Sequence, residues 1–341
     1  MTSYSCSKFD ATKDPKDRER DEQSLTNLYK TTPYPGPHVV RKKRLLGYLA
    51  PIETDLARRK RVRVLDAGCG TGPNIVSVGM AHPEWHLHAM DLSDASIEIA
   101  KRHAELNNVT VDIKQGSYVD KIPFDGVFDL IIATGTIHHC ADPVQAMKNI
   151  REKMDDNGYF LISVYGEFFD NSRLFIKEIL DMLQPDITNY RERFQLYDAL
   201  MQSYKEYRKN LPLKTKIGRL CLADIRDWIV AKISRSSKRS APYGPRWAWI
   251  SGPDDPHWNA WPDSFCNPCE RTYNMLNFRE LIEASGFAVV HMLSQGARRT
   301  YPIPKSWGDA YHRLDDWSKW RVDELMHYPD GLGINAILRK A

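Results

Sequence analysis

The stretch Val62-Arg63-Val64-Leu65-Asp66-Ala67-Gly68-Cys69-Gly70-Thr71-Gly72 decides the fold, because an apolar, β-branched segment runs directly into a glycine-rich turn. Gly68, Gly70 and Gly72 can adopt positive φ and carry no Cβ, so the backbone can turn sharply and approach a ligand closely. The amides at the start of the next helix would face that ligand. The stretch predicts a nucleotide site, although the glycine triplet alone leaves an ordinary strand-to-helix turn open.

A second strand supports the nucleotide site. Residues Trp85 to Met90 alternate between apolar and polar and end at Asp91, about twenty residues after the glycine run. A carboxylate at this place can accept hydrogen bonds from both ribose hydroxyls. Two strands and a helix therefore agree on the same site.

The residue before the glycine run is Asp66, and here the chain resembles a class I methyltransferase that uses S-adenosylmethionine (SAM). After a third strand expected over Val109 to Lys114, residues Phe128 to Pro143 resemble the fourth-strand motif of the small-molecule methyltransferases. In that motif paired histidines, here His138 and His139, precede an Asp-Pro. Four such motifs in the order of the family cover residues 60 to 166.

The resemblance implies an α/β fold with a Rossmann-like, seven-stranded class I methyltransferase sheet. Met147 to Met154 is predicted to be a helix, and Asp156 to Tyr165 resembles the turn and fifth strand that follow it. The sheet then still needs a helix and two strands. We expect these at Phe278 to Ser285, Phe287 to Leu293 and Leu332 to Leu338.

The stretch between strand five and these last elements is an insertion. Apolar residues recur in it at helical spacing over residues 171–183, 190–207 and 216–233, which predicts a helical cap. The expected organisation is a mobile N-terminus (1–24), an N-terminal lid and helix (25–60), a SAM-binding core (61–165), the helical cap (166–259) and a C-terminal part that completes the sheet (260–341).

The resemblance also assigns residues to SAM and to its product S-adenosylhomocysteine. Asp66 and the glycines would line the amino-acid and ribose end, Asp91 would hold the ribose, and Leu92 would lie beside the adenine. The family usually has an acidic residue after the glycine that follows strand three, whereas this chain has Ser117 and Tyr118. The predicted cofactor-binding set is Asp66, Gly68, Cys69, Gly70, Gly72, Asp91, Leu92, Ser117, Tyr118 and Thr134.

The N-terminal region changes character at Leu25. Before it, charged residues dominate and apolar residues are scarce, which is why mobility is expected there. After it comes an aromatic and proline-rich segment that ends at Pro37, and in one subgroup of these enzymes a Tyr-Pro segment of this kind folds over the SAM pocket. Tyr29 and Tyr34 are therefore candidate lid and substrate residues, with packing of both tyrosines on the surface of a helix as the alternative.

Candidate catalytic residues lie at the ends of strands four and five. The sulfonium of SAM already activates its methyl group, so the protein must align a nucleophile and exclude water. Where the nucleophile carries a proton, an imidazole suits its removal. We expect one of His138 and His139 to be the general base, with His138 favoured, and the other to bond to the backbone, while Tyr165 orients the substrate.

Aromatic residues gather in and just after the predicted cap, where five of the nine tryptophans fall: Trp228, Trp247, Trp249, Trp258 and Trp261. Such side chains can wall a pocket, although they are more often core. Trp258, Trp261 and Phe265 directly precede the return to the sheet. We expect one or two of these three to reach the substrate.

Composition favours a soluble, cytoplasmic enzyme. Hydrophobic residues make up 42% of the chain and charged residues 27%, and no uninterrupted apolar run approaches the roughly 20 residues of a membrane span. No secretory signal is apparent. The six scattered cysteines suggest reduced thiols. Cys266 and Cys269 have metal-ligand spacing, but without a second pair of ligands no metal is expected.

The charge of the predicted cap leaves the substrate class open. Residues 205–239 hold eleven Lys or Arg against three acidic residues, which can bind phosphates or form a solvated helix face. The favoured function is methylation of a small molecule enclosed by the cap. The alternative is methylation of RNA or protein through the basic stretch, with nucleic acid less favoured as a substrate. The third hypothesis is a non-catalytic scaffold subunit. The acceptor atom and the oligomeric state stay open.

Overall fold

The computed structural model describes residues 15–36, 43–167, 171–210, 258–293, 306, 308–326 and 333–341. The chain divides into two compact units. Unit 1 comprises Met1–Asn171 and Asn267–Ala341, and unit 2 comprises Ser172–Cys266. Unit 2 therefore begins and ends a few residues later than the predicted insertion.

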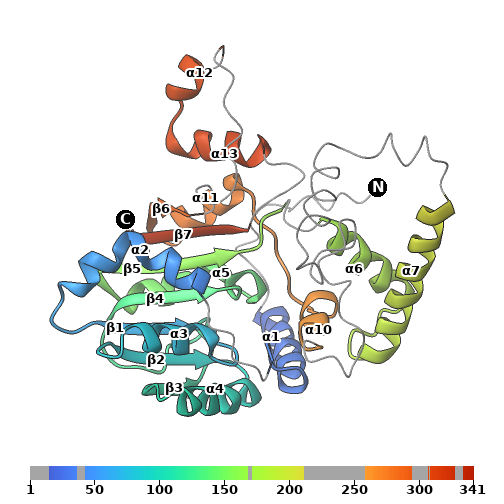
Figure 1. Cartoon of the computed structure of the whole chain (residues 1–341), viewed down its shortest axis with the longest axis horizontal. Coiled ribbons are helices and arrows are strands. Elements are labelled where there is room, and N and C mark those ends of the chain that lie inside the picture. Colours follow the sequence, from blue (N-terminus) through green and yellow to red (C-terminus); the bar gives the residue numbers. More distant parts are fainter. Residues whose placement is uncertain are drawn as a thin grey trace, which may run out of the picture. The chain divides into compact units, whose positions relative to one another are not determined.

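Unit 1 is built on a seven-stranded sheet in the order β3-β2-β1-β4-β5-β7-β6 (Figure 1). Strand β7 runs antiparallel to both of its neighbours, and the other pairs are parallel. This confirms the predicted Rossmann-like methyltransferase sheet. The strands are β1 (Arg63–Ala67), β2 (His86–Asp91), β3 (Val111–Gln115), β4 (Phe128–Thr134), β5 (Met154–Val164), β6 (Phe287–Met292) and β7 (Ile334–Lys340).

Helices flank this sheet, and several begin at side chains that cap them. Ser93 accepts a hydrogen bond from the amide of Ser96, Asp142 accepts one from that of Gln145, and Asn274 forms a capping box with Asn277. The described helices of unit 1 are α1 (Pro15–Thr31), α2 (Lys43–Ala57), α3 (Pro73–Ala81), α4 (Asp94–Leu106), the short 3₁₀ helix η1 (Ile137–His139), α5 (Pro143–Glu152), α11 (Met275–Ala284), α12 (Gly308–His312) and α13 (Asp316–Met326).

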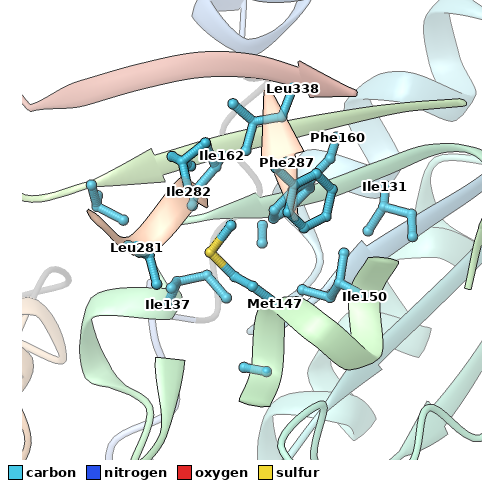
Figure 2. Packing of buried hydrophobic residues seen from close by; sticks show 14 of the residues in the cluster. Ile131, Ile137, Met147, Ile150, Phe160, Ile162, Leu281, Ile282, Phe287 and Leu338 are labelled. Carbon is cyan, nitrogen blue, oxygen red and sulfur yellow. The ribbon is translucent and has the colours of Figure 1, made fainter. Parts of the chain in front are cut away.

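Both faces of the sheet are buried, because successive strand residues point to opposite sides. The strand residues of one face pack with α5 and α11. There Met147 and Ile150 lie in one cluster with Leu281 and Ile282 over the strands (Figure 2). Those of the other face pack with α2, α3 and α4. The strand residues of the first face include Leu65, Ile131, Phe160 and Ile162, and those of the second include Val64, Leu130, Ile132 and Leu161.

The fifth strand begins earlier than predicted. Helix α5 ends at Glu152, and Met154 already pairs with Phe128, whereas the next pair joins Tyr159 to Leu130. The four residues between Met154 and Tyr159 therefore bulge from the strand. The predicted helix end at Met154 is wrong because this fully buried side chain is held by strand pairing, which its neighbours in the sequence do not reveal.

The predicted mobility of residues 1–24 is wrong for residues 15–24, which belong to α1. Leu25 and Leu28 bury one face of this helix, and Arg18 Nη2 lies 2.7 Å from Asp142 Oδ2 at the start of α5. Tyr29 accepts a 3.0 Å hydrogen bond at its hydroxyl from Asn267 Nδ2. The scarcity of apolar residues misled the prediction, because polar contacts supply much of the anchoring.

Unit 2 contains α6 (Asn171–Leu183), α7 (Tyr190–Asn210) and α10 (Ala260–Phe265). The first two confirm the helices predicted over 171–183 and 190–207, while the helix predicted over 216–233 lies outside the described residues. No helix in the described part of the chain is long and apolar enough to cross a membrane.

A buried arginine joins the helices of unit 2. The side chain of Arg193 is fully buried, and its Nη2 lies 2.7 Å from Asp181 Oδ1 on α6 and 2.8 Å from the carbonyl oxygen of Phe265 at the end of α10. Its Nη1 donates to the carbonyl oxygen of Gln184. A single guanidinium thus satisfies acceptors from three segments, because it carries five N–H donors.

Arg193→Ala should therefore lower the stability of unit 2 by about 3 kcal/mol or more, since buried carbonyls and a carboxylate lose their donor. Thermal melts by circular dichroism and protease cleavage within α6 and α7 would measure the loss. Arg191→Ala, on an exposed position of the same helix, is the control. Equal stability of the two variants would contradict a role of Arg193 in holding the helices together.

Candidate active site

A cavity of about 400 Å³ opens in unit 1 at the carboxyl ends of the parallel strands. Its lining includes residues that follow β1, β2, β3, β4 and β5. Ligands of open α/β sheets bind at this edge, and the volume suits a small ligand. The site therefore lies where the glycine run and Asp91 predict it.

The conformation of the glycine loop depends on its contact with the N-terminal segment at Tyr34. Gly70 has φ +53°, and a Cβ on it would lie 2.4 Å from the carbonyl oxygen of Tyr34. That same oxygen accepts a 3.0 Å hydrogen bond from the amide of Thr71. Gly70 is thus required because the N-terminal segment rests on the loop, a reason that the sequence motif did not reveal.

Gly72 differs from the other two glycines in its surroundings. It is the residue before α3, with φ +84°, and a Cβ on it would lie 3.0 Å from the Cβ of Ala100 on α4. Gly68, Cys69 and Gly70 line the cavity, whereas Gly72 is not part of its lining. This close approach of α4 accounts for a glycine at this position, and its predicted contact with SAM stays a prediction.

Asp91 holds the loop and faces the cavity. Its Oδ2 accepts a 2.8 Å hydrogen bond from the amide of Gly70, and its Oδ1 accepts one of 2.9 Å from the amide of Ser93. Each carboxylate oxygen can accept a further bond, so the side chain can also bind a diol. Burial raises the pKa of Asp91, which the two amides partly offset.

Asp66 lies outside the cavity lining, and its predicted place at the amino-acid end of SAM stays a prediction. Its side chain is fully buried, beside the backbone amide of Ile75 on α3. Burial and the nearby charge of Asp91 raise the pKa of Asp66 to about 7.

The ends of β2 and β3 form one side of the cavity. The amide of Gly116 donates a 3.0 Å hydrogen bond to the carbonyl oxygen of Asp91, which brings Leu92 and Ser117 to the same edge. Leu92, Ser117 and Tyr118 all line the cavity, and their contact with the cofactor stays a prediction. The Tyr118 hydroxyl forms a 2.7 Å hydrogen bond with Thr136 Oγ1, which fixes its ring beside the loop.

The two histidines of η1 have different surroundings. His139 lines the cavity, and its Nδ1 lies 3.0 Å from the carbonyl oxygen of Cys269. A carbonyl only accepts, so Nδ1 carries the proton and the Nε2 of the neutral ring has a free lone pair. His138 is fully buried outside the lining, with its ring centroid 3.8 Å from that of Tyr165. The geometry thus favours His139 over the predicted His138.

Two polar residues that the sequence analysis missed, Asn74 and Ser163, complete the wall beside the predicted Thr134 and Tyr165. Asn74 Nδ2 on α3 donates to Thr134 Oγ1 at 2.6 Å, and Ser163 Oγ on β5 donates to Asn335 Oδ1 on β7 at 2.7 Å. Asn74, Thr134 and Ser163 line the cavity together with Tyr165. A serine within the apolar run 159–164 was the available signal for Ser163.

The predicted substrate residues fall into two groups. Tyr29 and Tyr34 line the cavity of unit 1. In unit 2, Trp261 and Phe265 are fully buried, and Trp261 stacks on Trp258 with ring centroids 5.5 Å apart. These three form an aromatic core with Phe194 and Tyr197, so their contact with substrate stays a prediction. Trp228, Trp247, Trp249 and most of the basic stretch lie outside the described residues.

Comparison with known proteins agrees with this geometry. The family model of a methyltransferase domain matches residues 58–239, more than half of the chain. The chain belongs to this methyltransferase family. Its sheet order and glycine loop confirm the predicted resemblance to class I, SAM-dependent methyltransferases.

Individual relatives are distant. An uncharacterised Synechococcus protein is 24% identical to this chain. The match covers 78% of this chain and 57% of that protein. A Bacillus anthracis malonyl-[acyl-carrier protein] O-methyltransferase is 24% identical, and the match covers 38% of this chain and 46% of that enzyme. A Rickettsia akari ubiquinone biosynthesis O-methyltransferase is 28% identical, and the match covers 30% of this chain and 40% of that enzyme. The chain thus spans about half the length of the curated relatives it matches.

Among solved structures, PKMT2 from Rickettsia typhi in complex with AdoHcy superposes with a TM-score of 0.56 and 16% identity, covering 82% of this chain and 48% of that one. The same protein without that complex gives a TM-score of 0.57. At this identity the likeness shows the fold alone, and it confirms the predicted fold class.

The raised pKa of Asp66 predicts a pH dependence of stability. The unfolded carboxyl titrates at about 3.9 and the folded one at about 7, so between these values the folded protein binds a proton that the unfolded chain has lost. Stability should therefore fall as pH rises from 4 to 7, and Asp66→Asn should abolish this loss.

At pH 8 we expect Asp66→Asn to be more stable than the original protein by about 1 to 4 kcal/mol, and at pH 4 to be nearly equal to it. Denaturant unfolding of both proteins across this range would measure the difference. Asp125→Asn, at an exposed position, should show no such divergence. Parallel stability curves for Asp66→Asn would show that the buried carboxyl does not titrate there.

Proposed function

We propose that this protein transfers a methyl group from SAM to a small-molecule acceptor whose nucleophilic atom carries a proton, with His139 as the general base. The observation that carries the proposal is the hydrogen bond from His139 Nδ1 to the Cys269 carbonyl, which leaves Nε2 available at the cavity wall. A base is useful only for a protonated nucleophile, so the acceptor is a hydroxyl or a comparable group.

The residues of the cavity fit the cofactor. The partly buried carboxylate of Asp91 suits the ribose diol, the glycine loop suits the amino-acid end, and Leu92 suits one face of the adenine. When bound, SAM supplies a methyl group already activated by its sulfonium. The protein therefore has to bind, orient and keep water away from the reacting atoms.

The acceptor would lie between η1 and the end of β5. His139 Nε2 takes the proton from the nucleophile. The hydrogen bond from Nδ1 to the carbonyl oxygen of Cys269 holds the ring while the imidazole becomes positively charged. Tyr165 lines the same part of the cavity, its ring centroid 5.5 Å from that of His139, and orients the acceptor. Tyr29 and Tyr34 contribute the N-terminal part of the wall and limit access of water.

The names of the relatives support an oxygen acceptor, because both curated enzymes described above are O-methyltransferases. A hydroxyl is the oxygen group that needs a base at neutral pH, which agrees with His139. Methylation of RNA or protein has no comparable support, since the basic stretch on which that alternative depends lies mostly outside the described residues.

Asp91→Ala should weaken SAM binding by about tenfold or more, because it removes charge-assisted hydrogen bonds to the ribose and the anchor of the Gly70 amide. Isothermal titration calorimetry with S-adenosylhomocysteine measures the change. Asp94→Ala, at an exposed position three residues on, should bind as the original protein does. Unchanged affinity in folded Asp91→Ala would remove Asp91 from the site.

His139→Ala should lower turnover by about a hundredfold or more while S-adenosylhomocysteine affinity stays nearly intact, since the base acts on the acceptor. His138→Gln should retain most of the turnover, because this side chain lies outside the cavity lining. Steady-state kinetics on a panel of hydroxylated acceptors provides the measurement. Full activity of His139→Ala would exclude it as the base, and loss of cofactor binding would indicate a structural role.

A further inference from the structure

We propose that Glu22, on the N-terminal helix α1, recognises the 6-amino group of the adenine and so decides that the cofactor is an adenosine derivative. The inference rests on the proposed placement of SAM in the cavity. Glu22 lies outside residues 58–239, so the family match assigns it no role.

The place of the adenine follows from the register of the sheet. Asp91 and Gln115 are partners in the parallel pair β2–β3, and both strands end there. With the ribose on Asp91, the base extends toward the residues that follow these two strands. Leu92 and Val119 line this part of the cavity, and Leu25 of α1 lines it as well, which provides apolar surfaces for a purine ring.

The 6-amino group of adenine is a hydrogen-bond donor and needs an acceptor at the edge of this apolar space. Ser117 stands where the family has an acidic residue, but its hydroxyl is already engaged. It donates to Glu22 Oε1 at 3.2 Å and accepts from the amide of Val119 at 3.2 Å. Glu22 therefore brings a carboxylate from another helix to the position where the strand-three loop lacks one.

The carboxylate is held in place and can accept another bond. Ser117 occupies Oε1, which leaves Oε2 able to accept from an amino group. Helix α1 is fixed by the burial of Leu25 and Leu28 and by the ion pair of Arg18 with Asp142. Glu22 itself lines the cavity, so no rearrangement of the helix is needed to reach the ligand.

The electrostatics of the site agree with a missing donor. Burial and the charge of Asp120 raise the pKa of Glu22, while Ser117 and Arg18 act in the opposite direction. A carboxylate that has lost part of its hydration gains from a ligand N–H. The measurements are therefore made at one alkaline pH, because ionisation of Glu22 strengthens its bond to the amino group.

The test compares two ligands that differ at position 6 of the purine. S-adenosylhomocysteine carries an amino group there, whereas S-inosylhomocysteine carries a carbonyl oxygen, which a carboxylate repels. The original protein should prefer the adenosine ligand by about tenfold or more. Glu22→Gln should reduce this preference severalfold, because its amide can donate to the carbonyl oxygen as well as accept from the amino group.

Titration calorimetry of both ligands gives the ratio, and thermal melts without ligand check the fold. Glu19→Gln, an exposed position on the same helix, should keep the original ratio. An unaltered ratio in Glu22→Gln, equal weakening of both ligands, or no preference in the original protein would each overturn the inference. Failure of the original protein to bind S-adenosylhomocysteine at all would instead overturn the proposed function.

Discussion

The carboxylate of Asp91 is the interaction on which the site depends. It ends β2, accepts the amide of Gly70 from the loop after β1, and accepts the amide of Ser93 at the start of α4. Three segments that are separate in the sequence are thereby fixed around one partly buried carboxyl group. Backbone amides satisfy part of this carboxylate at the wall of the cavity, and its oxygens can still accept a bond from a ligand.

The N-terminal residues extend this arrangement beyond the sheet. The carbonyl oxygen of Tyr34 lies against Gly70 and accepts the amide of Thr71, and the hydroxyl of Ser93 donates to the carbonyl oxygen of Tyr29 at 3.1 Å. The loop that would bind the cofactor is thus supported from the outside by α1 and the segment after it. These residues precede the stretch that matches the family model, so this wall lies outside the matched domain.

The two histidines of η1 have different surroundings and therefore different proposed roles. His138 and His139 are adjacent, but one ring is enclosed beside Tyr165 and the other faces the cavity with its Nδ1 bound to Cys269. The carbonyl that fixes His139 comes from a residue 130 positions later in the chain. Such a contact selects a tautomer, and no local pattern around the histidines encodes it.

The sequence by itself determined the sheet and its glycine loop, because alternating apolar segments and a glycine-rich turn are local signals with a direct physical meaning. It also placed Asp91, Leu92 and Ser117 at one edge, since parallel strands end together. Only the tertiary structure decided that α1 is ordered, that Glu22 meets Ser117, that Gly72 and Asp66 lie off the cavity, and that His139 is the histidine that lines it. These outcomes depend on polar contacts and on packing between segments that are distant in the chain. Hydrophobic periodicity is a local signal and does not predict such contacts.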